Sequence, residues 1–354
     1  MKIIMLGASL DQNGGIATVE KLILKHTPSH LEIQHITSHD EGSITHRIIV
    51  FSQALVSLLW ILLLRQTDIV HIHLSDGGSL LRKAILALST FVFHKPVLIH
   101  AHGANFESTY FKLPKWAQQV LNLIFRQCNG FIVLSNTWKD FYTLNLGLDA
   151  KQVFVLPNPT EIPSQVPNRT NSAKIRLVFS GRVGKRKGAF DLIRAFANLP
   201  PQLKNCSELI MAGDGEIEQG EQLVESLNIR EYVTFLGWID EQQLDTLLAE
   251  ADVFVLPSYN EGLPMALLEA MSWGLPPIAT PVGGISELVT SNKDGLLVTP
   301  GDIEQLSNAM ELLIENETLR LSLGSAARKT VAPFDVKNYC ALLSDIYCSL
   351  LESK

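Results

Sequence analysis

The stretch Val253-Phe-Val-Leu256-Pro-Ser-Tyr-Asn-Glu-Gly-Leu-Pro264-Met-Ala-Leu-Leu-Glu269 contains a short apolar run, a loop and the start of a helix. The run Val253–Leu256 is apolar at every position, as in a parallel strand that is buried on both faces. Pro264 suits the first turn of a helix, because its fixed φ is already helical and the N–H that it lacks would have no partner there. The stretch therefore predicts a strand–loop–helix unit, the building block of α/β folds with a parallel sheet.

Similar apolar runs alternate with helical stretches along most of the chain: Lys2–Leu6, Ile69–Leu74, Val97–His100, Gly130–Leu134, Val153–Leu156, Arg176–Phe179, Glu208–Met211, Val233–Leu236 and Pro277–Ala279. A polar, proline-rich break at residues 157–173 separates two such series. We predict an α/β protein with two Rossmann-like, doubly wound domains. The N-terminal domain covers residues 1–160, a linker 161–173, the C-terminal domain 174–333 and a final helix 334–354. The two domains are expected to face each other across a cleft bordered by the carboxyl ends of their strands, where such sheets bind ligands.

The composition excludes several classes of protein. The 354 residues include 29 Lys and Arg against 36 Asp and Glu, a net charge of −7, which argues against nucleic acid as a partner. With 46% hydrophobic residues the chain is not disordered. The four cysteines form no C-x-x-C pair, so neither a disulfide framework nor a thiolate zinc site is predicted. The apolar run after Met1 is too short for a signal peptide, and we expect a cytoplasmic protein.

Two loops that follow predicted strands are rich in glycine. Gly14 and Gly15 allow the backbone to approach a ligand closely, although a plain strand-to-helix turn explains them equally well. They do not belong to a G-x-G-x-x-G fingerprint, so a dinucleotide cofactor is not indicated. The second loop, Gly181–Gly188, carries four cations, Arg182, Lys185, Arg186 and Lys187. Its place after a strand favours an anion site over a merely solvated charged surface.

Two carboxylates flank the start of the helix at Pro264. Glu261 lies in the preceding loop and Glu269 inside the helix. The five residues from Pro264 to Glu269 span about 7 Å, close to the distance between a diphosphate at a helix N-terminus and the ribose of the same nucleotide. Glu269 would then accept from ribose hydroxyls and Glu261 from sugar hydroxyls. The alternative is a surface glutamate and a buried one bound by backbone.

A series of short motifs extends over nearly the whole chain: Gly14-Gly15, Asp68–His73, His102-Gly103, Gly181-Arg182 to Lys187-Gly188, Gly213-Asp-Gly215, Phe235-Leu-Gly237, Glu261 to Glu269, and Pro281-Val-Gly-Gly284 followed by Glu287. By the order and spacing of these motifs, the chain resembles the family 4 glycosyltransferases, which are retaining enzymes of the GT-B fold. Within this family it resembles the bacterial surface-polysaccharide transferases. The resemblance implies a hexosyltransferase that uses a nucleoside-diphosphate sugar.

The resemblance also implies roles for individual residues. Arg182 and Lys187 resemble the pair that holds the donor diphosphate, and His102 the histidine that touches the donor sugar. Glu261 resembles the acceptor of donor-sugar hydroxyls and Glu269 the ribose ligand. The remaining expected substrate-binding residues are Gly14, Gly15, Gly213, Gly262, Leu263 and Pro264. The final helix is expected to cross back to the N-terminal domain.

No metal or cofactor is predicted. The chain has no Asp-x-Asp pair, so the cationic loop is expected to take the place of a metal at the diphosphate. His71 and His73 share one face of a strand, but a metal site would need a third ligand. Hydrogen-bonded histidines near the cleft are the preferred interpretation.

Three other functions stay open at this point. A nucleotide-sugar epimerase of the same fold would need no acceptor. A phosphorylase would carry pyridoxal phosphate on a lysine. An inactive binding scaffold would have no reason to keep the charged residues at 182, 187, 261 and 269.

The segment Ile48–Leu64 has 17 residues without a charge, between Arg47 and Arg65. A membrane span here would place the strands at Ile3 and Ile69 on opposite sides, so one sheet could not form. The segment is therefore a core helix or a helix with an apolar flank on a membrane surface. The second possibility is supported by residues that suit the anionic headgroups of a membrane. These are Trp60 within the segment and Arg82, Lys83, Lys112, Lys115 and Trp116 outside it. We predict a UDP- or GDP-sugar donor and a lipid-linked glycan acceptor at the inner face of the cell membrane, with a soluble acceptor as the alternative.

Overall fold

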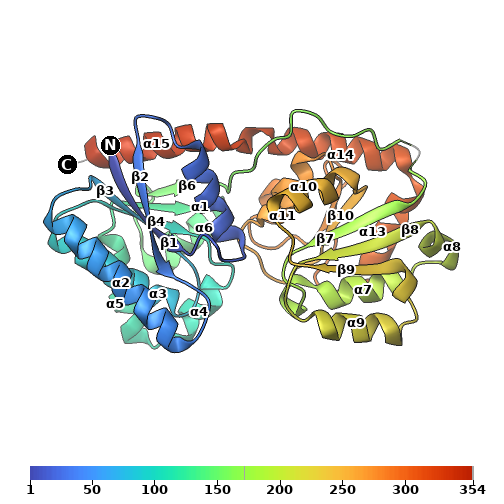
Figure 1. Ribbon diagram of the computed structural model, residues 1–354, viewed down its shortest axis with the longest axis horizontal. Helices are drawn as coiled ribbons and strands as arrows, with labels where there is room; N and C mark the ends of the chain where they lie inside the picture. The colour runs from blue at the N-terminus through green and yellow to red at the C-terminus, as the bar shows by residue number, and fades with distance from the viewer. Residues whose placement is uncertain (171, 353–354) are drawn as a thin grey trace. The chain divides into compact units, whose positions relative to one another are not determined.

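The computed structural model describes residues 1–170 and 172–352, and these fall into two compact units. Unit 1 comprises Met1–Pro159 together with the chain from Val336 onward, and unit 2 comprises Thr160–Asp335. Each unit contains a parallel sheet of six strands (Figure 1). This is the doubly wound α/β architecture that the alternation of apolar runs and helices predicts.

The sheet of unit 1 has the order β2-β1-β3-β4-β5-β6. Its strands are β1 (Lys2–Ala8), β2 (Glu32–His39), β3 (Ile69–Leu74), β4 (Val97–Ala101), β5 (Gly130–Val133) and β6 (Val153–Val155). Its helices are α1 (Gly15–His26), α2 (Ile44–Leu63), α3 (Ser79–Val92), α4 (Phe106–Lys112), α5 (Lys115–Arg126), α6 (Asn136–Phe141), the π-helical turn η1 (Tyr142–Leu146) and α15 (Val336–Glu352). Every residue of β3, β4 and β5 is buried, because helices cover both faces of the sheet.

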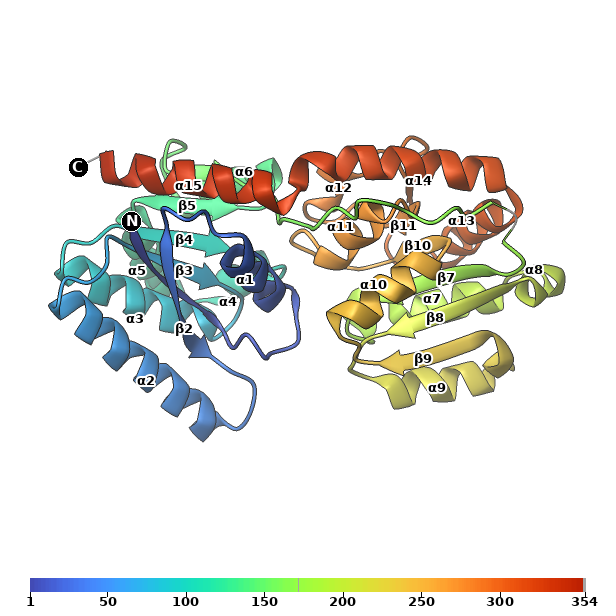
Figure 2. The same cartoon turned by 45° about the horizontal axis from the view of Figure 1, so that its top comes forward.

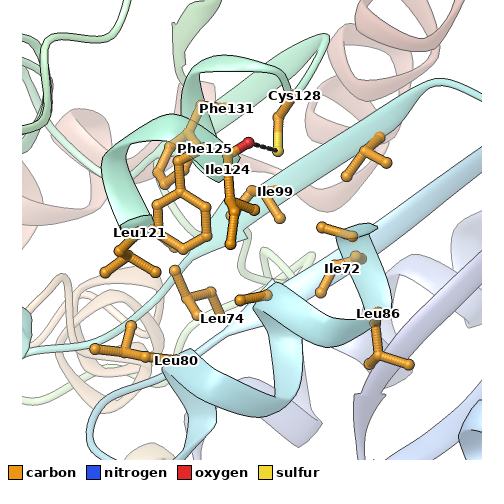
Figure 3. Close-up of a cluster of buried hydrophobic side chains, with 14 of the residues drawn as sticks. Ile72, Leu74, Leu80, Leu86, Ile99, Leu121, Ile124, Phe125, Cys128 and Phe131 are labelled. Carbon is orange, nitrogen blue, oxygen red and sulfur yellow. Dashed lines mark hydrogen bonds between the residues drawn. The ribbon is translucent and has the colours of Figure 1, made fainter. Parts of the chain in front are cut away.

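The two faces of this sheet differ in chemistry. One face packs against α2, α3 and α5 through aliphatic and aromatic side chains such as Leu74, Ile99 and Phe125 (Figure 3). The other face is covered by α1 and α15, as both views show (Figures 1 and 2). There the strands present histidines, and α15 is held by polar contacts: His30 Nε2 lies 2.9 Å from Ser344 Oγ, and His71 Nδ1 lies 2.8 Å from Tyr347 Oη.

The sheet of unit 2 has the order β12-β11-β10-β7-β8-β9. Its strands are β7 (Ile175–Ser180), β8 (Ser207–Ala212), β9 (Val233–Gly237), β10 (Val253–Leu256), β11 (Pro277–Ala279) and β12 (Leu296–Leu297). Its α-helices are α7 (Ala189–Ala197), α8 (Pro201–Asn205), α9 (Ile217–Ser226), α10 (Glu241–Glu250), α11 (Met265–Ser272), α12 (Ile285–Leu288), α13 (Ile303–Glu315) and α14 (Glu317–Val331). Single 3-10 turns are η2 (Lys185–Lys187), η3 (Arg230–Tyr232) and η4 (Ala332–Phe334). The chain reverses its direction of travel across the sheet between β7 and β10, and the loops after these strands form the switch point where such sheets bind ligands.

The segment expected as a linker, residues 161–173, packs against unit 2 over its described part. Arg169 donates from Nε to the Ala251 carbonyl at 2.6 Å and from Nη2 to the Leu248 carbonyl at 3.0 Å, which satisfies acceptors at the end of α10. The proline-rich composition excludes helix and central strand, but it does not prevent a long side chain from attaching the segment to a neighbouring helix. The last helix begins at Val336, two residues later than expected, because η4 occupies residues 332–334.

The apolar segment around Trp60 forms α2, and most of that helix is not core. Only Ala54, Leu58, Ile61 and Leu62 are buried, whereas Val56 is 67% exposed and Trp60 60% exposed. The interpretation as a core helix is therefore wrong for the outer surface of α2. The helix is long and apolar enough to cross a membrane by length and composition. However, α2 connects β2 to β3, and both strands pair with β1 in one sheet, which a crossing would separate.

Candidate active site

An ion pair lies at the switch point of unit 2, between the loops after β7 and β10. Lys187 Nζ lies 2.7 Å from Glu261 Oε1, and both side chains are largely buried. The same oxygen accepts a hydrogen bond from Ser258 Oγ at 2.7 Å, while Arg186 Nη1 approaches Glu261 Oε2 at 3.7 Å. Arg186 is one of the four cations predicted for the loop after β7, whereas Ser258, which contacts Glu261 within the loop after β10, was not predicted as a site residue. The pair holds a cation and a carboxylate in fixed positions at the edge where a ligand would bind.

A glycine places Lys187 beside β10. Gly188 has a φ of +68°, which favours glycine, and a Cβ there would lie 2.0 Å from the Pro257 carbonyl oxygen. The 3-10 turn η2 ends at this residue. The close approach of backbone to backbone therefore brings the cationic turn onto the end of β10.

Arg182 is the more exposed of the two predicted diphosphate ligands. Its Nε and Nη2 donate to the two carboxylate oxygens of Asp214 at 3.2 and 3.3 Å. The loops after β7 and β8 touch here, because Gly213 has a φ of +143° and a Cβ on it would lie 2.0 Å from the Gly181 carbonyl oxygen. Asp214 thus orients the Arg182 guanidinium, and the sequence motif alone does not reveal this partner.

Helix α11 begins one residue after the position expected from sequence. Pro264 is its N-cap, with an extended ψ of 128°, so the first helical residue is Met265. No side chain caps this N-terminus. The preceding Gly262 accepts at its carbonyl from the Gly284 N–H at 2.7 Å, which fixes the approach of the loop before α12. Gly262, Leu263 and Pro264 are all buried, and their segment leads directly into a helix end that attracts anions.

Glu269 lies on α11 and is partly buried. Burial raises its pKa to about 7, and the carboxylates of Asp245 and Glu241 act in the same direction. A carboxyl group of this kind is half ionised near neutral pH. Hydroxyl donors at the site would favour its charged form.

In unit 1, His102 follows β4 and touches a second histidine. Its Nε2 lies 2.9 Å from His73 Nδ1, and the two rings stack with centroids 5.1 Å apart. Burial lowers the pKa of His102 to about 3, so the imidazole is neutral; a hydrogen bond with Asn158 opposes the shift. A Cβ on the adjacent Gly103 would lie 1.9 Å from Asp76 Oδ1, so a larger residue there would displace the Asp76 carboxylate.

A buried carboxylate that the sequence motifs do not include lies behind this pair. Glu20 on α1 is fully buried, accepts from the Ala8 N–H at 3.3 Å, and contacts His35 Nε2 at 3.0 Å and His73 Nδ1 at 3.5 Å. Gly7 makes room for it, because a Cβ there would lie 2.0 Å from Glu20 Oε1. The signal in the sequence is an acidic residue on the apolar side of a helix, between Val19 and Leu22.

His71, His73 and His100 form a group in which one ring nitrogen from each residue lies within 4.8 Å of the other two. A third histidine is thus present beside the two that the sequence analysis weighed as ligands. Burial holds the pKa of each imidazole well below its usual range, so all three are neutral. His71 Nδ1 and His73 Nδ1 each have a hydrogen-bond partner, as expected for these two histidines. Within the described chain, His100 has no partner at either ring nitrogen.

The loop after β1 carries the remaining two predicted residues. Gly14 is the N-cap of α1 with a φ of +143°, and Gly15 is the first residue of that helix. A Cβ on Gly14 would meet nothing within 4 Å, so the backbone conformation and not a close contact requires glycine here. The loop lies at the switch point of unit 1, between β1 and β3.

Two family models match adjacent parts of the chain. The model described as Glycosyltransferase Family 4 matches residues 26–162, and that described as Glycosyl transferases group 1 matches residues 163–330. The chain is 28% identical over 324 residues to the UDP-Gal:alpha-D-GlcNAc-diphosphoundecaprenol alpha-1,3-galactosyltransferase of Escherichia coli, which covers 85% of this chain and 80% of that protein. It is 29% identical to an alpha-1,4-N-acetyl-D-galactosaminyltransferase of Campylobacter jejuni that acts on an undecaprenol-linked glycan, over 69% of this chain and 65% of that protein.

Solved structures show the same fold. HepE of Anabaena, in complex with UDP, matches with a TM-score of 0.76 at 19% identity over 99% of this chain and all of that one. A sucrose-phosphate synthase from Thermosynechococcus elongatus matches with a TM-score of 0.79 at 19% identity over the full length of both chains. The fold is GT-B, and the chain belongs to the family 4 glycosyltransferases.

Proposed function

We propose that the protein transfers a hexosyl group from a nucleoside-diphosphate sugar to a hydroxyl group of a lipid-linked glycan, with retention at the anomeric carbon. The observation that carries the proposal is the Lys187–Glu261 pair, which lies at the switch point of unit 2. Retention follows the family resemblance.

The cations suit the leaving group of such a reaction. Breaking the sugar–phosphate bond builds negative charge on the diphosphate, and fixed cations that meet this charge stabilise the transition state. Lys187 and Arg182 supply two cations, and the uncapped N-terminus of α11 adds a positive dipole end. Because these groups supply positive charge without a metal, we propose a metal-independent enzyme with no cofactor.

The carboxylates suit the rest of the donor. Glu261, already ordered by Lys187 and Ser258, would accept from hydroxyls of the transferred sugar. Glu269 would accept from the ribose hydroxyls. His102 of unit 1 is assigned to the donor sugar by the resemblance, and its neutral form suits a hydrogen bond rather than charge stabilisation. UDP is the favoured nucleotide, since the Escherichia coli relative uses UDP-Gal and HepE binds UDP and UDP-glucose.

A lipid-linked acceptor is supported by the outer surface of unit 1. Helices α2, α3 and α5 lie in a row on one face of the sheet (Figure 2). They expose the large apolar side chains Ile48, Val56, Trp60, Leu63, Leu81, Leu88, Val92, Trp116, Val120 and Leu123, which we call the apolar face. With the cations Arg47, Lys112 and Lys115 beside it, this face has the chemistry of a surface that rests on anionic lipid. We propose a cytoplasmic protein that binds the inner surface of the membrane.

The proposal is tested by incubating the purified protein with a panel of UDP- and GDP-sugars and a synthetic prenyl-diphosphate-linked acceptor sugar. We expect one sugar to be transferred, with release of the nucleoside diphosphate that depends on the acceptor. Conversion of a nucleotide sugar into its epimer without acceptor would identify an epimerase instead. Failure of every nucleotide sugar to raise the melting temperature would support a scaffold.

A further inference from the structure

Two arginines lie in the first turns of neighbouring helices at the carboxyl edge of the unit 1 sheet. Arg47 belongs to the first turn of α2, which follows β2, and Arg82 to the first turn of α3, which follows β3. Neither first turn contains an acidic residue, and no side chain caps α3. A cation at a helix N-terminus adds to the positive end of the helix dipole, so both positions are electrostatically unfavourable without an anion.

A third cation lies beneath them. Lys83 is buried, and its Nζ donates to the Leu6 carbonyl at 3.2 Å and to Ser38 Oγ, both neutral groups. Burial lowers the pKa of Lys83 to about 7; Glu20 opposes this shift and Arg82 adds to it. Burial and the charges of Arg82, Lys83 and Arg47 together lower the pKa of His39, with Asp40 acting in the opposite direction. Arg47 and Arg82 are therefore near enough to His39, at the end of β2, to act on its charge, and Lys83, which is about half protonated at neutral pH, contacts Ser38 of the same strand.

The carboxylates that follow the two strands are engaged elsewhere. Asp40 contacts His46 Nε2 and accepts from the Glu41 N–H, both at 2.9 Å. Asp76 accepts from the Asn105 N–H at 2.9 Å, in the direction of the His102 loop. Within residues 1–170 and 172–352, neither Arg47 nor Arg82 forms an ion pair, and the buried Arg82 Nε has no hydrogen-bond partner. In a chain with a net charge of −7, these two arginines are thus cations that no carboxylate of the described chain pairs with.

The cluster lies at one end of the apolar face. Arg47 is followed along α2 by the exposed Ile48, Val56 and Trp60, so a molecule with a phosphate head and an apolar tail can bind both surfaces at once. The Escherichia coli and Campylobacter jejuni relatives both act on sugars joined to undecaprenol through a diphosphate. Arg forms bidentate contacts to phosphate oxygens and suits such a head group.

We propose that Arg47 and Arg82, backed by the buried Lys83, bind the diphosphate of a prenyl-linked acceptor. This inference rests on the proposed lipid-linked acceptor and adds the residues that recognise its head group. The site would place the acceptor sugar at the carboxyl edge of the sheet, on the side of the Gly14 loop and His102. Arg182 and Lys187, which are proposed to bind the donor diphosphate, lie in unit 2, and their assignment is independent of this one.

The test measures binding of farnesyl diphosphate and of farnesol to the full-length protein by calorimetry. The variants are Arg82→Gln, the double variant Arg47→Gln/Arg82→Gln, and Lys151→Gln as a control that removes an exposed cation before β6. UDP binding, which belongs to unit 2, is measured in parallel, and so is flotation with phosphatidylglycerol vesicles. We expect the double variant to bind farnesyl diphosphate at least tenfold more weakly, and Lys151→Gln to bind it like the wild type.

The outcomes separate the two proposals. Wild-type affinity of the double variant for farnesyl diphosphate, or equal binding of farnesol and farnesyl diphosphate by the wild type, would overturn the diphosphate site. Loss of vesicle binding with unchanged farnesyl diphosphate binding would also overturn it, because the arginines would then be a general headgroup surface. Absence of UDP binding in all proteins would count against the donor function, and the farnesyl diphosphate comparison would still decide the site.

Discussion

Lys187 and Glu261 carry opposite charges 2.7 Å apart in a largely buried place, and we propose that this pair sets the chemistry of unit 2. A buried pair of this kind is weak evidence for a stabilising role, because desolvation offsets much of the attraction. Its position at the switch point, where such sheets bind ligands, indicates a role in ligand binding instead. The donor diphosphate and sugar would engage the two groups separately.

Replacement of Lys187 or Arg182 by Ala should lower turnover about 10²-fold or more, because each cation meets charge that grows in the transition state. Lys185→Ala is the matched control, since it removes an exposed cation from the same turn and should leave turnover near the wild-type value. Steady-state kinetics at saturating donor measure the effect, and circular dichroism checks the fold. Equal rates for all three variants would remove the two residues from the site.

Glu269 predicts a pH dependence of donor binding. Its pKa of about 7 in the free protein means that the carboxylate gains charge as the pH rises from 6 to 8. Ribose hydroxyls donate to the charged form, so affinity for UDP-glucose should increase about tenfold over this range. The diphosphate diester of this probe does not itself titrate there. Glu269→Gln should bind more weakly with a flat profile, and a wild-type-like slope in the variant would contradict the assignment.

Two elements depend on features that the sequence motifs do not contain. One is a close contact between backbone segments, and the other is an exposed helix surface. The turn η2 holds Lys187 in place only because Gly188 permits both a positive φ and contact with Pro257. Helix α2 combines an inner edge of four buried residues with an outer surface that no other element of the described chain covers.

Gly188→Ala should displace the cationic turn, since the new Cβ cannot remain 2.0 Å from a carbonyl oxygen. We expect a lower melting temperature and at least a tenfold loss in donor affinity. Gly237→Ala controls for backbone strain alone, because Gly237 has a φ of +69° and a Cβ there would meet no atom within 4 Å. If both variants lose stability but bind donor equally, the contact with Pro257 does not position the turn.

Polar replacement on α2 should separate membrane binding from folding. Val56→Ser/Trp60→Ser removes two exposed apolar side chains, so the free energy of unfolding should change little while binding to anionic vesicles weakens. Flotation at low salt measures the change. A matched pair on the inner edge, Leu58→Ser/Leu62→Ser, should instead unfold the helix. Unchanged flotation of the outer variant would exclude α2 from the membrane surface.

Across the whole molecule, the features that the sequence predicts are those set by the local order of residues, namely the strands and the loops that bind ligands. Apolar runs predict the strands because both faces of each sheet are covered, and the glycine- and charge-rich loops after strands predict where ligands bind. The burial of Glu20, the pairing of Arg182 with Asp214 and the exposure of α2 were not predictable in this way. Each depends on contacts between segments distant in the chain, and the length of an apolar run does not tell whether another helix covers it.

The central claim is a metal-independent, retaining transfer from a nucleotide sugar, and one measurement tests it most directly. The transferred sugar on a prenyl-diphosphate-linked acceptor is examined by NMR after a reaction in excess EDTA. We predict a product whose anomeric carbon has the configuration of the donor, formed at the same rate as without chelator. An inverted anomeric carbon, or activity that is lost with EDTA and restored by Mn²⁺ or Mg²⁺, would contradict it.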